Sequence, residues 1–168
     1  MENIGIFYGS STGNTEAAAK QIQKEFGEDI ATTFDVNNAK AIDIEQFSNL
    51  ILGSSTWGIG DIQDDFDNFL SEISSANLKG KNIAIFGYGD QETYADSFVD
   101  AIGIIYEALE NKGCKIVGKI PTEGYQYDSS KAEIDGKLIG LPLDDENQCN
   151  LTNERIKIWV QQLKECFK

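Results

Sequence analysis

The chain has 168 residues and carries 28 acidic side chains against 14 basic ones, giving a formal charge of −14 at pH 7. This charge repels a phosphate backbone and argues against nucleic-acid binding, and the absence of histidine removes the most frequent general base at neutral pH. No apolar run approaches the length of a membrane span, so the composition favours one globular domain over residues 1–168.

The N-terminal part of the chain alternates between strand and helix patterns. Short apolar runs at Ile4–Tyr8 and Ile30–Phe34 are bounded by turn residues, which is typical of buried strands. Between them, Ala18, Ile22 and Phe26 recur every four residues and predict a helix with one apolar face. We therefore expect this part to fold as strand, helix, strand.

The middle of the chain repeats the pattern. Leu50–Gly53 and Ile83–Phe86 are further apolar runs, and they predict the third and fourth strands. A helix is expected after the fourth strand because apolar residues follow an i, i+4, i+7, i+11 stripe. These residues are Phe98, Ile102, Ile105 and Leu109.

The last predicted strand is interrupted. Ile116–Ile120 predicts a fifth strand, but the segment PTEGYQYDSSKAEIDGK follows before a short apolar return, LIGLPL. We interpret this segment as an insertion in the last strand. A final helix is predicted behind an N-cap at Thr152. Its expected apolar face consists of Ile156, Trp159, Val160, Leu163 and Phe167.

This order of elements predicts the fold class. Parallel strands need crossover connections, and right-handed crossovers through helices cover both faces of a sheet. The chain is therefore expected to be an α/β protein, a three-layer α/β/α sandwich around a five-stranded parallel sheet.

The cysteines and the N-terminus indicate the compartment. Cys114, Cys149 and Cys166 show no CxxC or other metal-ligand spacing, and their odd number argues against a disulfide framework. The start, MENIGIFY, lacks the basic residues and the cleavage site of a secretory signal. We expect a cytoplasmic protein with free thiols and no bound metal.

The stretch GSSTGNT, residues 9–15, follows the first strand and precedes the first helix. If the helix begins near Asn14, its free N–H groups and the positive end of its dipole face this loop, which suits a phosphate. The loop contains neither the lysine of a GxxxxGK[ST] loop nor a GxGxxG fingerprint. It favours a single monophosphate held by hydroxyl and amide groups, although a polar turn that only caps the helix remains an alternative.

Two further loops follow the third and fourth strands. They read SSTWGIGD, residues 54–61, and GYGDQETYADSF, residues 87–98. Each places an aromatic residue, Trp57 or Tyr94, among glycine and polar residues, where it can stack on a planar ligand. In an open parallel sheet, ligands bind at the carboxyl ends of the strands. The three loops together favour a ligand with a phosphate at one end and a flat ring at the other.

With these motifs the sequence resembles the flavodoxins, small FMN-containing electron carriers. The resemblance covers nearly the whole chain and includes FYGSSTGNT, TWGIGD, GDQETYADSF and DDENQCNLTNERIKIWVQQL. The excursion TEGYQYDSSKA is similar to the insertion of the long-chain type. The resemblance implies the strand order 2-1-3-4-5, and a low-potential protein that carries electrons on non-covalently bound FMN between redox enzymes, without turnover of a substrate of its own.

The resemblance also implies the binding residues. The FMN phosphate would be surrounded by Ser10, Ser11, Thr12, Gly13, Asn14 and Thr15. Trp57 would lie on the inner face of the isoalloxazine ring and Tyr94 on the outer face. Main-chain groups at the ring edge would come from Thr56, Gly58, Ile59, Gly60, Gly89 and Asp90. Ser55 stands where the family usually has proline, and Ser97 and Val99 also differ from the residues often found there.

Charge patterning predicts how the protein meets its partners. No lysine or arginine occurs in residues 41–78 or 82–111, the two spans that carry the ring loops. Acidic residues crowd these spans: Asp61, Asp64, Asp65, Asp67, Asp90, Glu92, Asp96 and Asp100. Such charge steers the basic docking faces expected of flavodoxin or ferredoxin reductases and other oxidoreductases, and it disfavours a doubly reduced, anionic flavin. The resemblance further implies a monomer that binds neither nucleic acid nor membrane.

One alternative function stays open at this point. An FMN-dependent NAD(P)H or quinone reductase of flavodoxin-like fold would share the three loops. It would need an open substrate site over the ring, and Tyr94 on the outer face would hinder direct hydride transfer. A phosphoryl-receiver domain shares the order of elements, but the chain has GSST where that site needs acidic residues.

Overall fold

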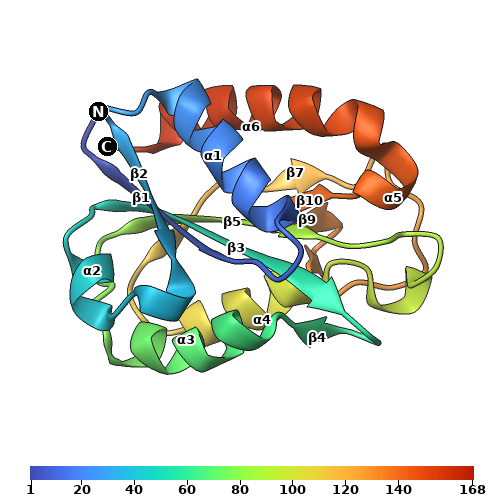
Figure 1. The fold of residues 1–168 in the computed structure, drawn as a ribbon, viewed down its shortest axis with the longest axis horizontal. Helices are drawn as coiled ribbons and strands as arrows, with labels where there is room; N and C mark the ends of the chain where they lie inside the picture. Colours follow the sequence, from blue (N-terminus) through green and yellow to red (C-terminus); the bar gives the residue numbers. More distant parts are fainter.

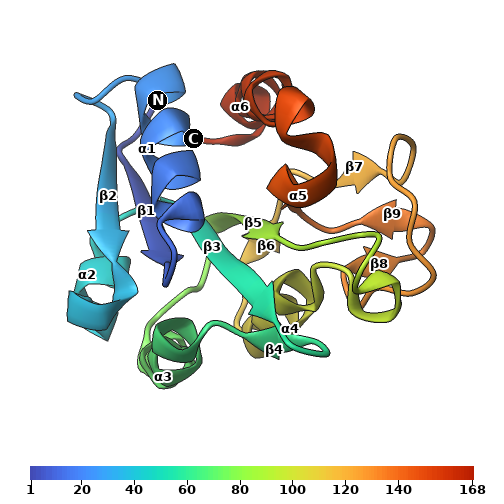
Figure 2. The same cartoon turned by 45° about the vertical axis from the view of Figure 1, so that its right-hand side comes forward.

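The computed structural model describes residues 1–168 and places a central sheet between two layers of helices (Figure 1). One face is covered by α1 (Asn14–Phe26) and α6 (Thr152–Cys166), and the other by α3 (Asp64–Ser75) and α4 (Asp100–Leu109). Turning the molecule separates these layers clearly (Figure 2). Two apolar clusters fill the spaces between the sheet and its helices, and the expected three-layer sandwich is confirmed.

The sheet has the order β2-β1-β3-β5-β10, and all its pairings along this path are parallel. Its strands are β1 (Ile4–Gly9), β2 (Ala31–Asp35), β3 (Asn49–Trp57), β5 (Asn82–Tyr88) and β10 (Leu141–Leu143). Counted as the five strands expected from the sequence, this is the order 2-1-3-4-5. The core strands β1 and β5 are buried along their whole length, which explains their continuous apolar sequences.

The fifth strand differs from the sequence-based expectation. A continuous strand over Ile116–Ile120 is wrong, because only β6 (Lys115–Ile116) pairs with β5, at its start. Gly118 has a φ of +81°, and its carbonyl accepts a hydrogen bond of 2.9 Å from the buried Trp159 Nε1. This conformation ends the strand and turns the chain out of the sheet, so the edge position is completed only by β10.

The chain between β6 and β10 forms the expected insertion. It contains β7 (Ile120–Pro121), β8 (Glu133–Ile134) and β9 (Lys137–Leu138), which make a small antiparallel sheet in the order β7-β9-β8. In Figure 2 this sheet lies at the side of the molecule, next to α4 and away from α1.

The helices correct one prediction and add three elements. Thr152 is the first residue of α6 and not its N-cap, which is Leu151; the Thr152 hydroxyl instead donates to Asp145 Oδ1 at 2.5 Å. Helix α3 takes the helix position that the alternation predicts between the third and fourth strands, although the sequence pattern did not assign its residues. The short helices α2 (Ala41–Glu45) and α5 (Asp145–Gln148) were not predicted. The two-residue strand β4 (Asp61–Ile62) pairs with the end of β3. None of the helices is both long and apolar enough to cross a bilayer.

A buried amide pair joins the two chain ends to the sheet. Asn49 and Asn82 open strands β3 and β5, lie opposite each other in register, and are joined by a 3.4 Å hydrogen bond. Asn49 Nδ2 donates to the carbonyls of Glu2 (3.4 Å) and Lys168 (3.3 Å), and its Oδ1 accepts from the N–H of Lys168 at 3.1 Å. Figure 1 shows the two termini side by side at this end of the molecule.

The hydrogen bonds from Asn49 to both termini give a prediction about stability. Asn49→Leu removes the buried amide and leaves polar groups of both termini without partners, so the free energy of unfolding is expected to fall by about 2–4 kcal/mol. Urea denaturation of the apoprotein measures the change. Asn68→Ala, at an exposed position of α3, is the control and is expected to lie within about 0.5 kcal/mol of the wild type. An equally small effect of Asn49→Leu would contradict a stabilising role for the Asn49 hydrogen bonds.

Candidate functional site

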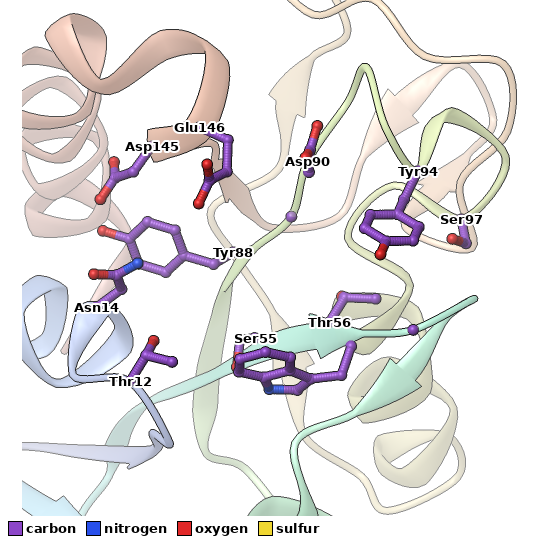
Figure 3. Close-up of a pocket in the computed structure, with 13 residues that line it drawn as sticks. Thr12, Asn14, Ser55, Thr56, Tyr88, Asp90, Tyr94, Ser97, Asp145 and Glu146 are labelled. Atoms are coloured by element: carbon purple, nitrogen blue, oxygen red, sulfur yellow. The ribbon is translucent and has the colours of Figure 1, made fainter.

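A pocket of about 400 Å³ opens at the carboxyl ends of β1, β3 and β5 (Figure 3). This volume lies within the range of about 300–1,000 Å³ that is usual for small-molecule sites. Eight of the predicted residues line it: Thr12, Asn14, Thr56, Trp57, Gly58, Gly89, Asp90 and Tyr94. The other predicted residues do not line it: Ser10, Ser11, Gly13, Thr15, Ile59 and Gly60. Their proposed contacts stay predictions.

The first loop of the site ends at the start of α1. The helix begins at Asn14, as predicted, with Gly13 in a left-handed conformation as its N-cap. No side chain caps this end, so the N–H groups of the first turn and the positive end of the helix dipole face the loop. Thr15, the second residue of α1, is only 1% exposed. Thr12 and Asn14 project into the pocket (Figure 3).

The second loop joins β3 to β4. Trp57 ends β3 and leaves 42% of its surface exposed, although the other tryptophan, Trp159, is only 1% exposed. Gly58 has a φ of +52°, a conformation that costs little without a Cβ. Gly60 N–H closes the turn with a 3.2 Å bond to the Trp57 carbonyl. Ile59 lies at the tip with 89% exposure, outside the pocket.

The third loop is shaped by Asp90. Its Oδ1 accepts hydrogen bonds from Thr93 N (2.9 Å), Glu92 N (3.2 Å) and Asn147 Nδ2 (2.8 Å). Partial burial opposes ionisation, but these bonds outweigh it and hold the pKa of Asp90 below its usual value. Tyr94 N–H donates to the Asp90 carbonyl at 3.0 Å, and the Tyr94 ring stays 44% exposed above the pocket. The turn therefore fixes the Tyr94 ring at the carboxyl end of β5.

The predicted site lacked five residues of the lining: Ser55, Tyr88, Ser97, Asp145 and Glu146. The alternation along β5 places Ala84, Phe86 and Tyr88 against the same helix layer, so it predicts a core position for Tyr88 and does not reveal that Tyr88 lines the pocket. Asp145 and Glu146 begin α5 directly after the edge strand, but the insertion hides that relation in the sequence. Val99, by contrast, is buried with a φ of +47° and does not reach the pocket.

The pocket has no cationic lining. Asp90, Asp145 and Glu146 are its only charged side chains. Burial and the nearby Asp145 carboxylate raise the pKa of Tyr88, so its phenol stays protonated and can donate.

No group of three or more metal-ligating side chains occurs in the chain. Hydroxyl and amide donors at one end and two exposed aromatic rings at the other suit a planar ligand with a single phosphate.

Comparisons with known proteins agree with this geometry. The family model described as flavodoxin matches residues 6–159. A flavodoxin of Nostoc sp. is 47% identical over 166 residues, covering 99% of this chain and 98% of that protein. A flavodoxin of Buchnera aphidicola is 46% identical over 168 residues, with 99% and 98% covered. The crystal structure of Fusobacterium nucleatum flavodoxin bound to flavin mononucleotide is similar with a TM-score of 0.95 and 37% identity, covering 100% of both chains.

Behind the second loop lies a buried carboxyl group. Asp100 was expected among the surface acids, but it is only 6% exposed, and Oδ2 packs against Gly60, where an added Cβ would approach it to 2.7 Å. Its Oδ1 accepts from Lys131 N at 2.8 Å. Burial raises the pKa of Asp100, and the Lys131 N–H and ammonium group offset only part of this effect.

The raised pKa of Asp100 predicts a pH-dependent effect on stability. A folded-state pKa above the unfolded value means that stability is highest while the group is protonated and falls as pH rises through the folded-state pKa. Asp100→Asn keeps an acceptor for Lys131 N and never ionises. We expect the variant to be more stable than the wild type at pH 7, with a difference that shrinks as the pH falls towards the unfolded-state pKa of aspartate, about 3.9. Urea denaturation across this range tests it, and a difference independent of pH would contradict the assignment.

Proposed function

The chain belongs to the flavodoxin family, and on this basis we propose how its residues carry low-potential electrons on a non-covalently bound FMN. The protein is an electron carrier for redox partner proteins and does not turn over a substrate of its own. When bound, FMN supplies reversible one- and two-electron transfer. The observation that carries the proposal is the pocket itself, which joins a helix N-terminus to two exposed aromatic rings at successive strand ends.

The phosphate end is assigned to the first loop. We propose that the hydroxyl groups and main-chain N–H groups of residues 10–15 surround the phosphate: Ser10, Ser11, Thr12, Gly13, Asn14 and Thr15. The uncapped start of α1 supports this, because its N–H groups and dipole favour an anion. The lack of a cation in the lining fits one phosphate better than a polyphosphate chain.

The ring end is assigned to the second and third loops. Trp57 and Tyr94 are proposed to stack on opposite faces of the isoalloxazine ring, which would cover the apolar surface that both now expose. Main-chain groups of the two loops would meet the polar ring edge: Thr56, Gly58, Ile59, Gly60, Gly89 and Asp90. Thr56 is held in place by a 3.1 Å bond from Ala101 N to its hydroxyl, which ties the loop to the start of α4.

Negative charge is proposed to set both the potential and the choice of partner. The acidic lining has no counter-charge, and the only ion pairs in the chain, Lys20–Glu16 and Lys40–Glu72, include no residue of the lining. Carboxylates near the ring oppose the addition of a second electron and so lower that potential. The same field attracts partners with basic docking faces. We propose that residues 1–168 act as one FMN-binding domain and as a monomer.

Reduction experiments test the carrier function. The apoprotein is expected to bind FMN with quenching of the flavin fluorescence. The loaded protein is expected to stay oxidised with NADPH alone and to be reduced when a flavodoxin reductase is added, as followed by visible absorbance. Rapid turnover of NADPH with a quinone and no added reductase would contradict the proposal and favour an FMN-dependent reductase.

Salt dependence tests the proposed docking face. The rate of reduction by a basic reductase is expected to fall as ionic strength rises, because salt screens the attraction. Asp61→Asn with Asp64→Asn, next to the Trp57 loop, is expected to lower this rate at low salt by about two- to tenfold and to flatten its salt dependence. The control, Glu28→Gln with Asp29→Asn, changes the net charge equally before β2, at the opposite edge of the sheet. Equal effects of the two pairs would contradict a localised docking face.

A further inference from the structure

Gln63 is a buried polar side chain between two halves of the pocket. It directly follows β4, serves as the N-cap of α3, and is 1% exposed. Its main-chain N–H donates to the Ser55 carbonyl at 3.2 Å and to Ser54 Oγ at 3.3 Å, at the end of β3. Its side chain reaches in the other direction, to the loop after β1. Gln63 therefore touches both the phosphate loop and the strand that leads to Trp57.

The hydrogen bonds fix the orientation of the Gln63 amide. Its Oε1 lies 3.0 Å from the main-chain N of Phe66, which can only donate, so this atom must be the acceptor. Nε2 then faces the two remaining partners, Asp65 Oδ2 at 3.0 Å and Ser11 Oγ at 3.1 Å. Both of its hydrogen atoms are thus used, one for the carboxylate and one for the hydroxyl.

This orientation decides what the Ser11 hydroxyl can do. A serine hydroxyl has one hydrogen to donate and two lone pairs that accept. Because Gln63 Nε2 donates to Ser11 Oγ, the hydrogen of Ser11 cannot point towards Gln63. It remains free for an acceptor in the loop. The Ser10 hydroxyl also keeps its hydrogen free, since its Oγ accepts a hydrogen bond from the N–H of Gly13 at 3.1 Å.

We propose that Gln63 is a positioning residue that orients Ser11 as a hydrogen-bond donor to the flavin phosphate. The inference rests on the proposed function, because it concerns the loop assigned to that phosphate. A loop without a cation holds an anion only through donors, so a hydroxyl that points its hydrogen elsewhere would present a lone pair to the phosphate. The hydrogen bonds from Phe66 N to Gln63 Oε1 and from Gln63 Nε2 to Ser11 Oγ prevent this.

The neighbouring main chain is built around this amide. Gly9, the last residue of β1, lies so close to it that an added Cβ would be 2.2 Å from Gln63 Oε1. A side chain at position 9 would displace the amide from both Phe66 and Ser11. The glycine before the serine-rich loop is thus explained by the space that Gln63 needs, in addition to any contact with a ligand.

A polarity-swap variant, Gln63→Glu with Asp65→Asn, tests the proposal without changing the net charge. The introduced glutamate still accepts from Phe66 N, and the amide of the introduced asparagine can donate to its second carboxylate oxygen. That oxygen now accepts from Ser11 and draws the serine hydrogen away from the loop. Affinities for FMN and for riboflavin, which lacks the phosphate, are measured by quenching of flavin fluorescence. Asp65→Asn alone and Ser11→Ala are the matched single variants.

The swap variant is expected to weaken FMN binding by about tenfold or more and to change riboflavin binding by less than about twofold. Retained riboflavin binding also shows that the ring pocket is folded. Ser11→Ala in the wild-type background is expected to weaken FMN binding to a similar extent. In the swap background it is expected to add less than about twofold, since the serine no longer donates to the phosphate.

Two results would overturn the inference. One is a ratio of FMN to riboflavin affinity in the swap variant that stays within about twofold of the wild type. The other is an equal cost of Ser11→Ala in both backgrounds, which would mean that Gln63 acts by charge or packing alone. Failure of the proposed function is a separate outcome, because wild-type protein would then bind neither flavin.

Discussion

The parallel alignment of β1, β3 and β5 is the constraint on which the rest of the structure depends. Gly9 of β1 pairs with Ser54 of β3, and Ser54 pairs with Gly87 of β5; β1 ends at this level, β5 one residue later and β3 at Trp57, so all three carboxyl ends lie on the same side of the sheet. The loops that follow them must therefore open at one edge of the sheet. The burial of these strands on both faces keeps that register fixed, because a shift by one residue would exchange the side chains packed against the two helix layers.

The same alignment sets the direction of the helices relative to the pocket. The helices run antiparallel to the strands, so α1 presents its N-terminus at the pocket edge while helix C-termini gather at the opposite edge. There the ammonium groups of Lys81, Lys112 and Lys168 donate to main-chain carbonyls. Lys81 and Lys112 thus bond to carbonyls at the ends of α2 and α3, whereas the pocket edge has acidic side chains and the free N–H groups of α1. This arrangement supports the proposal of an acidic docking face at the pocket edge.

Polar side chains hold the loops that the strands only bring together. Asn147 joins α5 to the third loop through Asp90, and Gln63 joins the first loop to the end of β3. The insertion supports the third loop as well, since the N–H groups of Asp128 and Ser129 donate to the Ala95 carbonyl. Each of these links crosses between segments far apart in the chain, so the pocket is a property of the assembled sheet and its covering layers.

The sequence by itself determined the alternation of strands and helices, the three-layer fold and the three loops of the site, because these follow from apolar period, glycine placement and polar residues within short windows. The phosphate interpretation assumed that α1 begins near Asn14, and the helix does begin there. Only the tertiary structure decided that the fifth strand breaks at Gly118, that Thr152 bonds to Asp145 and does not cap its helix, and that Tyr88 lines the pocket. The physical reason is that these outcomes depend on partners from distant segments, whose positions are set by strand register and packing.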